Sequence, residues 1–218
     1  RYRQSCMAKP NTLSHFLFCP NEPVAAAHPS LNLVCVLASH CKAHYPHAPT
    51  QFISRHLYLQ LCWQAIYAYC YWLTCKRNAH HPMQLQLKMS GAYSRGFTLT
   101  GAPLLSQAEQ NNALIEFVSS VGKWINTKYA LGTKEQGRLL IDTLNSAFER
   151  AHSLNLASVE HIAHCHQQLH NLISKHFNLN TSFKLTAERL TCCRYYLAGY
   201  KKCKTCPKKD INTNEHTP

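Results

Sequence analysis

Four cysteines near the C-terminal end of the chain are the residues best suited to chemistry. Cys192 and Cys193 are adjacent, nine residues follow, and Cys203 and Cys206 form a Cys-x2-Cys pair. Four thiolates in so short a segment can ligate a tetrahedral zinc ion or an iron–sulfur cluster. Structural zinc sites usually separate the cysteines of each pair by two to four residues. The side chains of adjacent cysteines diverge, and the two irons of a [2Fe–2S] cluster accommodate this more easily than one ion. The spacing therefore favours the cluster over zinc, a disulfide or incidental thiols.

This arrangement resembles the C-terminal motif of the FhuF-type ferric-siderophore reductases, whose spacer is ten residues rather than nine. The resemblance covers about residues 189–207, and the rest of the chain is similar only in being a mostly helical body of comparable size. It implies that Cys192, Cys193, Cys203 and Cys206 bind a [2Fe–2S] cluster. The implied activity is one-electron reduction of Fe(III) held by a siderophore of the hydroxamate type. Fe(II) binds such oxygen ligands weakly, so reduction would release it in the cytoplasm.

Basic and aromatic residues surround the four cysteines. Residues 186–210 contain seven Lys or Arg against two acidic residues, hence a net charge of +5. Such cations would raise the reduction potential of a negatively charged cluster and attract an acidic electron donor. A solvated basic tail is the simpler interpretation, and core packing is the simpler one for the tyrosines. The candidates for contact with the substrate or the donor are Arg189, Arg194, Lys201, Lys202, Lys204, Tyr195 and Tyr196.

The low glycine content bears on the source of electrons. The chain has only 7 glycines and contains neither GxGxxG nor GxxxxGK[ST], so no bound nucleotide or flavin is expected. The electrons would come from a separate ferredoxin or flavoprotein. Two other functions remain open, namely a zinc-containing nucleic-acid-binding protein and an iron–sulfur electron carrier or sensor without a chelate substrate. No second Cys-x2-Cys pair and no arginine-rich run accompany the motif, so nucleic acid is not the expected partner.

The composition predicts a folded chain with reduced thiols. The 218 residues are 45% hydrophobic and 15% charged with a net charge of +13, which excludes a disordered chain. The other eight of the 12 cysteines lie mostly in apolar runs, which is typical of buried thiols in a cytoplasmic protein. The chain opens Arg-Tyr-Arg without a secretory pattern. The uncharged stretch Leu57–Cys75 carries four tyrosines and two glutamines, so a buried helix is expected rather than a membrane span. Peripheral association with the inner face of the membrane remains compatible with the sequence.

The expected fold is α+β and predominantly helical, with a body over residues 1–185 and a short cluster segment over 186–218. Residues 31–38 suit either a helix or a strand, and a long helix is expected over about 51–76. Strict alternation predicts a strand over 83–89, and a second strand over 97–100 would follow a seven-residue hairpin loop. The two strands form a small antiparallel hairpin.

Three more helices are expected from their start signals. Ser106 with Glu109 is a capping box that opens a helix ending at Gly132. Thr133 with Gln136 is read as a second capping box, and Ser158 starts a helix to about Phe177. This last helix carries several histidines between residues 161 and 176. Helical spacing places His176 on its apolar arc and His164 away from it, so the histidines are dispersed and core or solvated roles are expected.

Overall fold

The computed structural model describes residues 25–104, 106–181, 183, 189–202 and 206–208, so predictions that concern other residues lie outside the described part. These residues form five α-helices and a small antiparallel sheet, which confirms the predominantly helical α+β fold. In chain order the elements are β1 (Ala25–Ala27), α2 (Leu31–His44), α3 (Thr50–Thr74), η1 (Pro82–Gln84), β2 (Leu85–Ser90), β3 (Tyr93–Leu99), α4 (Gln107–Asn126), α5 (Thr133–Ser153), α6 (Val159–His176) and η2 (Tyr195–Ala198). The apolar run at 31–38 belongs to a helix.

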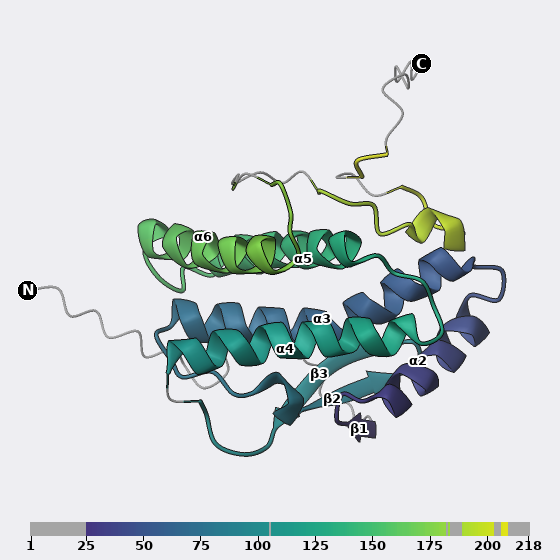
Figure 1. The fold of residues 1–218 in the computed structure, drawn as a ribbon, viewed down its shortest axis with the longest axis horizontal. Coiled ribbons are helices and arrows are strands. Elements are labelled where there is room, and N and C mark those ends of the chain that lie inside the picture. The colour runs from purple at the N-terminus through teal and green to yellow at the C-terminus, as the bar shows by residue number, and fades with distance from the viewer. Residues whose placement is uncertain (1–24, 105, 182, 184–188, 203–205, 209–218) are drawn as a thin grey trace, which may run out of the picture.

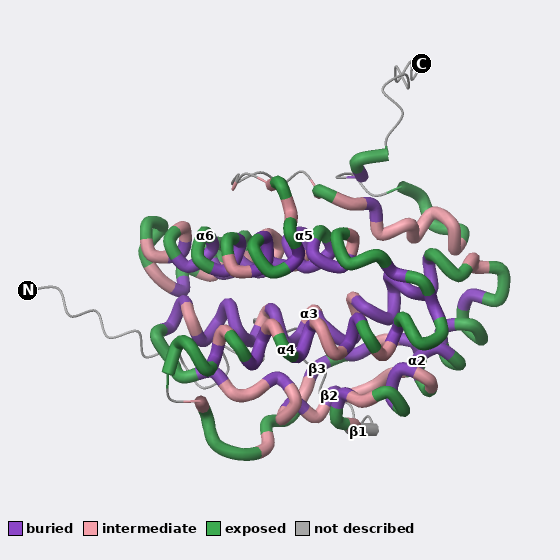
Figure 2. Tube along the Cα trace, in the orientation of Figure 1, coloured by how far each residue is buried: buried purple, intermediate pink, exposed green. Residues whose placement is uncertain are grey.

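The long helix α3 lies in the middle of the molecule and is buried over most of its surface (Figures 1 and 2). It packs against all four other helices and against β3. Leu57, Leu61 and Ile66 are almost inaccessible, as are the tyrosines Tyr58 and Tyr69. A helix that is apolar all round needs such cover, and the prediction of a buried helix is confirmed. None of the helices in the described part of the chain combines the length and apolar character that crossing a membrane requires.

The sheet has the order β1-β2-β3, with both pairs antiparallel. The predicted alternation holds in β2, where Leu85 and Leu87 are buried, although the strand starts at Leu85 after the turn η1. The predicted seven-residue loop is wrong, because β3 already begins at Tyr93 and a two-residue turn at Gly91 and Ala92 joins the strands. Gly91 has a positive φ of 57°, which favours glycine. The short strand β1 was not expected.

The N-termini of α4, α5 and α6 show which of the predicted start signals are correct. At Ser106 both bonds of the predicted capping box are present, and Ser158 also caps its helix through the hydroxyl. Gly132 does not end α4, which stops at Asn126; it precedes α5 as the N-cap with an ordinary φ of −60°. The second capping box is therefore wrong, because Thr133 is already helical and the Gln136 side chain donates to the carbonyl of Leu131.

Gly137 on α5 allows Phe177 at the end of α6 to approach closely. Substitution of this glycine therefore tests the packing of α6 on α5. A methyl group at position 137 would lie 2.5 Å from the Cβ of Phe177. Gly137→Ala should therefore lower the free energy of unfolding by about 2 kcal/mol, although alanine is the better helix former by about 1 kcal/mol. Urea denaturation measures the change. Gly132→Ser adds a side chain in open space at an N-cap and should leave stability unchanged or slightly higher. A stabilising Gly137→Ala would contradict the close contact.

Candidate functional site

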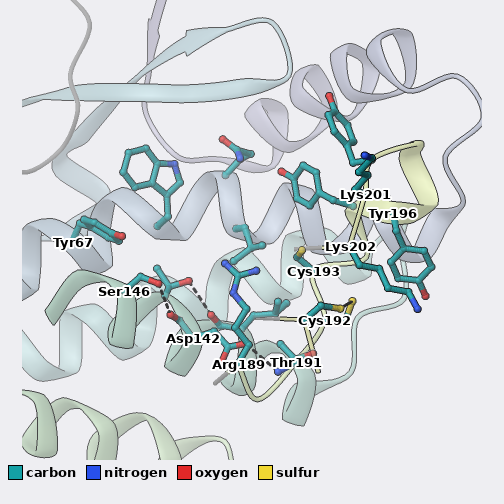
Figure 3. Close-up of a pocket in the computed structure, with 18 residues that line it drawn as sticks. Tyr67, Asp142, Ser146, Arg189, Thr191, Cys192, Cys193, Tyr196, Lys201 and Lys202 are labelled. Carbon is teal, nitrogen blue, oxygen red and sulfur yellow. Dashed lines mark hydrogen bonds between the residues drawn. The ribbon is translucent and has the colours of Figure 1, made fainter. Parts of the chain in front are cut away.

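The segment that carries the cysteines is tied to α5 by one carboxylate. Asp142, buried on α5, accepts hydrogen bonds from the backbone N–H groups of Leu190 (2.7 Å) and Thr191 (3.0 Å). Figure 3 shows Asp142 and Thr191 side by side. Burial raises the pKa of Asp142 to about 6, although the two N–H donors and the nearby Arg189 act in the opposite direction. The carboxylate holds the chain directly before Cys192.

A second attachment joins the segment to α3. Tyr195 lies 2.8 Å from Nδ1 of His56, whose Nε2 is 2.8 Å from the carbonyl oxygen of Ala92. Because a carbonyl can only accept, Nε2 carries the hydrogen and Nδ1 accepts from the tyrosine hydroxyl. Burial lowers the pKa of His56, in agreement with this neutral form. The Tyr195 ring also contacts Phe52 edge-on, so it packs into the body.

Between these attachments the chain turns and brings two sulfur atoms together. Arg194 has a positive φ of 60°, and its N–H donates to Sγ of Cys192 at 3.3 Å. Sγ of Cys192 lies 3.5 Å from Sγ of Cys206. Two thiolates on one tetrahedral ion with metal–sulfur bonds of about 2.3 Å lie about 3.8 Å apart. Cys192 and Cys206 are therefore close enough to share one metal ion.

Cys193, the third described cysteine of the motif, points away from this pair of sulfur atoms. Figure 3 shows the side chains of Cys192 and Cys193 leaving the chain in different directions, as expected for adjacent residues. Cys203 lies outside the described residues, and within the described part no three side chains of the His, Cys, Asp or Glu type are placed to hold one metal ion. Burial raises the pKa of the Cys192 thiol, while the Arg194 N–H acts against this. The described geometry thus comprises one close sulfur pair and one diverging thiol.

These cysteines line a cavity of about 560 Å³ between α3, α5 and the C-terminal segment (Figure 3). Its wall is aromatic and apolar on the α3 side and basic on the segment side. Its lining includes Trp63 and Tyr67 from α3, Asp142 from α5, and Arg189, Cys192, Cys193, Tyr195, Tyr196, Lys201, Lys202 and Cys206 from the segment. The volume is in the range of small-molecule sites.

Most of the predicted contact residues reach this cavity. Arg189, Tyr195, Tyr196, Lys201 and Lys202 line it, and the Lys202 ammonium lies 5.8 Å from the centre of the Tyr196 ring. Arg194 is not among the lining residues and serves the turn, and Lys204 lies outside the described residues. No sequence pattern points to Trp63, Tyr67, Asp142 or His56, which are distant from the motif along the chain.

A buried cation of the body also lies near the sulfur pair. Arg55 on α3 is 4% exposed and forms an ion pair with Glu135 of α5. Burial lowers its pKa to about 10, with Arg194 acting in the same direction and Cys192 against it. Arg55 stays protonated at neutral pH and favours negative charge on the thiols nearby.

All but one of the other described cysteines belong to the core. Cys41, Cys62, Cys70, Cys75 and Cys165 are buried, which confirms their predicted packing role, whereas Cys35 is half-buried. Burial raises the pKa of Cys41 to about 11 and those of Cys62 and Cys70 well above their usual value. These thiols remain protonated and apolar in character.

The histidines of α6 are dispersed around the helix, as predicted, but the prediction for His176 is wrong. His166 and His170 are buried against α5, while His164 is exposed. His176 was expected on the apolar arc and is exposed, with Nε2 2.9 Å from Ser119 Oγ. His166 stacks on Phe148, and its Nε2 lies 2.8 Å from Asn145 Oδ1, so it has a packing role.

Comparisons of the chain with models of protein families, with curated proteins and with solved structures find no match.

The attachment through Asp142 can be tested by hydrogen exchange. Asp142→Asn replaces one acceptor oxygen with a donor group, so one of the two bonds to Leu190 and Thr191 is lost. Exchange of these two amides should accelerate about tenfold, while amides in the middle of α3 keep their protection. Ser146→Ala, which changes a neighbouring cavity residue on α5, should leave both amides as in the wild type. Unchanged exchange in Asp142→Asn would show that the carboxylate does not hold the segment.

His166 makes stability sensitive to acid. Burial, with a smaller contribution from His170, lowers its pKa from 6.5 to about 4. Between these two pH values the histidine is protonated in the unfolded chain but neutral in the folded chain. Stability due to this group is fully present above pH 6.5 and is lost as the pH falls toward 4. His166→Gln should reduce the loss of unfolding free energy between pH 7 and pH 4 by about 3 kcal/mol. His164→Gln, at an exposed position, should retain the wild-type loss in the same denaturation series.

Proposed function

We propose that the protein is a ferric-siderophore reductase that uses a cysteine-bound [2Fe–2S] cluster. The observation that carries the proposal is the approach of Cys192 and Cys206 to 3.5 Å at the edge of a cavity with aromatic and basic walls. The resemblance of the Cys-Cys-x9-Cys-x2-Cys motif to the FhuF-type reductases agrees with it.

The described thiols fit this assignment. Cys192 and Cys206 have the separation of two ligands of one iron, and the diverging Cys193 is free to serve a second iron together with Cys203. A [2Fe–2S] cluster held by these cysteines would donate electrons one at a time. The buried Arg55 and the backbone N–H of Arg194 both favour negatively charged sulfur.

The cavity supplies the features that a bulky ferric chelate requires. Trp63 and Tyr67 offer flat apolar walls for the ligand frame, and Arg189, Lys201 and Lys202 offer donors to its oxygen atoms. Electron transfer to Fe(III) breaks no bond of the ligand, so no general base or nucleophile is required. The cavity has to hold the chelate close to the cysteines.

A separate donor protein would supply the electrons, in keeping with the lack of a nucleotide-binding loop in the sequence. Lys201 and Lys202 are exposed beside the cysteines. Exposed cations at this place would attract an acidic ferredoxin or flavoprotein, and the attraction would weaken with added salt. Reduced iron would then leave the chelate in the cytoplasm.

The ultraviolet–visible spectrum of protein purified without oxygen tests the cofactor. The wild type should be red-brown, with broad absorption that bleaches on reduction by dithionite, and Cys206→Ser should lose or shift these bands. Cys35→Ser, a half-buried cysteine of α2, is the matched control and should keep the wild-type spectrum. A colourless protein with one zinc ion per chain would overturn the proposal and favour the nucleic-acid-binding alternative.

Stopped-flow mixing then tests the substrate. The reduced wild type should be re-oxidised by ferric hydroxamate complexes with the appearance of Fe(II). A cluster that no ferric chelate re-oxidises would point to an electron carrier or sensor.

A further inference from the structure

A second cavity lies at the end of the helical bundle opposite the cysteines. It has a volume of about 410 Å³ and is formed by the chain after α3, the first turn of α4 and the first half of α6. Figure 1 shows that these parts of the three helices lie at the end of the bundle away from the C-terminal segment. Leu73 on its wall is 18 residues beyond Arg55 on α3, or about 27 Å along the helix axis. The side chains that matter here are Lys76, Arg77, Gln107, His161, His164 and Gln168. This cavity is separate from the site of the proposed reductase.

Two consecutive cations stand at its rim. Lys76 takes a left-handed conformation with φ of 52°, and the N–H of Arg77 bonds to the carbonyl of Trp72 at 2.7 Å. The Arg77 guanidinium lies 5.8 Å from the centre of the Tyr71 ring, which orients it. Among the described residues, none that lines the cavity is acidic and no carboxylate is within ion-pair distance of either cation. The two charges are exposed and available to a ligand.

The α6 wall adds nitrogen donors on one helix face. His161, His164 and Gln168 follow one another at spacings of three and four residues and all line the cavity. His161 Nε2 lies 3.6 Å from the buried Sγ of Cys165. The adjacent Lys76 and Arg77 would repel a metal cation, and no third ligand of the His, Cys, Asp or Glu type is placed to complete a site in the described part of the chain.

We propose that this cavity binds the phosphate group of a small phosphate monoester. An arginine fork, a lysine and imidazole nitrogens are suited to phosphate oxygens. The amide nitrogen of Gln107 already donates to Tyr69 and Asn111, so the amide of Gln168 is the one placed to contact the rest of the molecule. The volume suits a small metabolite. The proposal does not depend on the cysteine cluster.

Titration calorimetry with glycerol 3-phosphate tests the site, with inorganic phosphate and vesicles containing phosphatidic acid as parallel probes. The wild type should bind glycerol 3-phosphate, and Arg77→Gln should weaken binding about tenfold or more. Lys134→Gln, which removes one exposed charge at the start of α5 at the other end of the bundle, should leave binding unchanged. The imidazole resonances of His161 and His164 should shift on binding in the wild type.

Each outcome decides the proposal or identifies the source of the phosphate. Binding of vesicles but not of the soluble ester would support phosphate recognition and assign it to a lipid headgroup. Absence of binding of all three probes at millimolar concentration would overturn the proposal. Equal weakening by Arg77→Gln and Lys134→Gln would also overturn it, because the binding would then follow net charge rather than the cavity.

Discussion

A 25-residue helix with apolar side chains on every face is stable in water only when other elements cover it, and the architecture follows from this requirement. Helices α4, α5 and α6 cover α3 along its length, while α2 and the sheet cover its first half (Figure 1). Several polar side chains of α3 are therefore buried, where an unpaired polar group is unfavourable. Arg55 and His56 find partners on α5, on the turn after β2 and on the cysteine segment.

The need to pair buried polar groups also explains how the cysteine segment is held in a defined position, although its described residues form no strand and no long helix. Its backbone N–H groups at Leu190 and Thr191 are satisfied by Asp142, and Tyr195 occupies the hydrogen-bonding position that His56 leaves open. Burial of the Asp142 carboxylate is unfavourable, as its raised pKa indicates. Because burial of this carboxylate is unfavourable, its bonds to the two residues before Cys192 are consistent with a role in positioning that cysteine.

The sequence predicted the elements whose signals are local. The uncharged run in α3 and the Ser106 capping box depend on neighbouring residues alone, and both predictions are confirmed. Gly132 was misread because glycine is common both after and before helices, and only its φ distinguishes the two. His176 was misplaced because helical periodicity cannot show where the covering helices end. Asp142 and His56 could not be found, since their partners lie 48 and 139 residues away in the sequence.

The protonation of each cysteine in this chain depends on the groups that surround it. Inside the core, desolvation alone raises the pKa of Cys41, and Cys62 and Cys70 are likewise held as neutral thiols that pack like small hydrophobic residues. At the segment, Cys192 receives an N–H bond and lies near the Arg55 charge and a second sulfur atom. The Arg194 N–H bond favours the thiolate, which is the form that binds metal, whereas burial and the second sulfur atom raise the pKa of Cys192. Because the attachments through Asp142 and His56 hold the segment before and after Cys192, the helical body determines where the described cysteines of the motif lie beside the cavity.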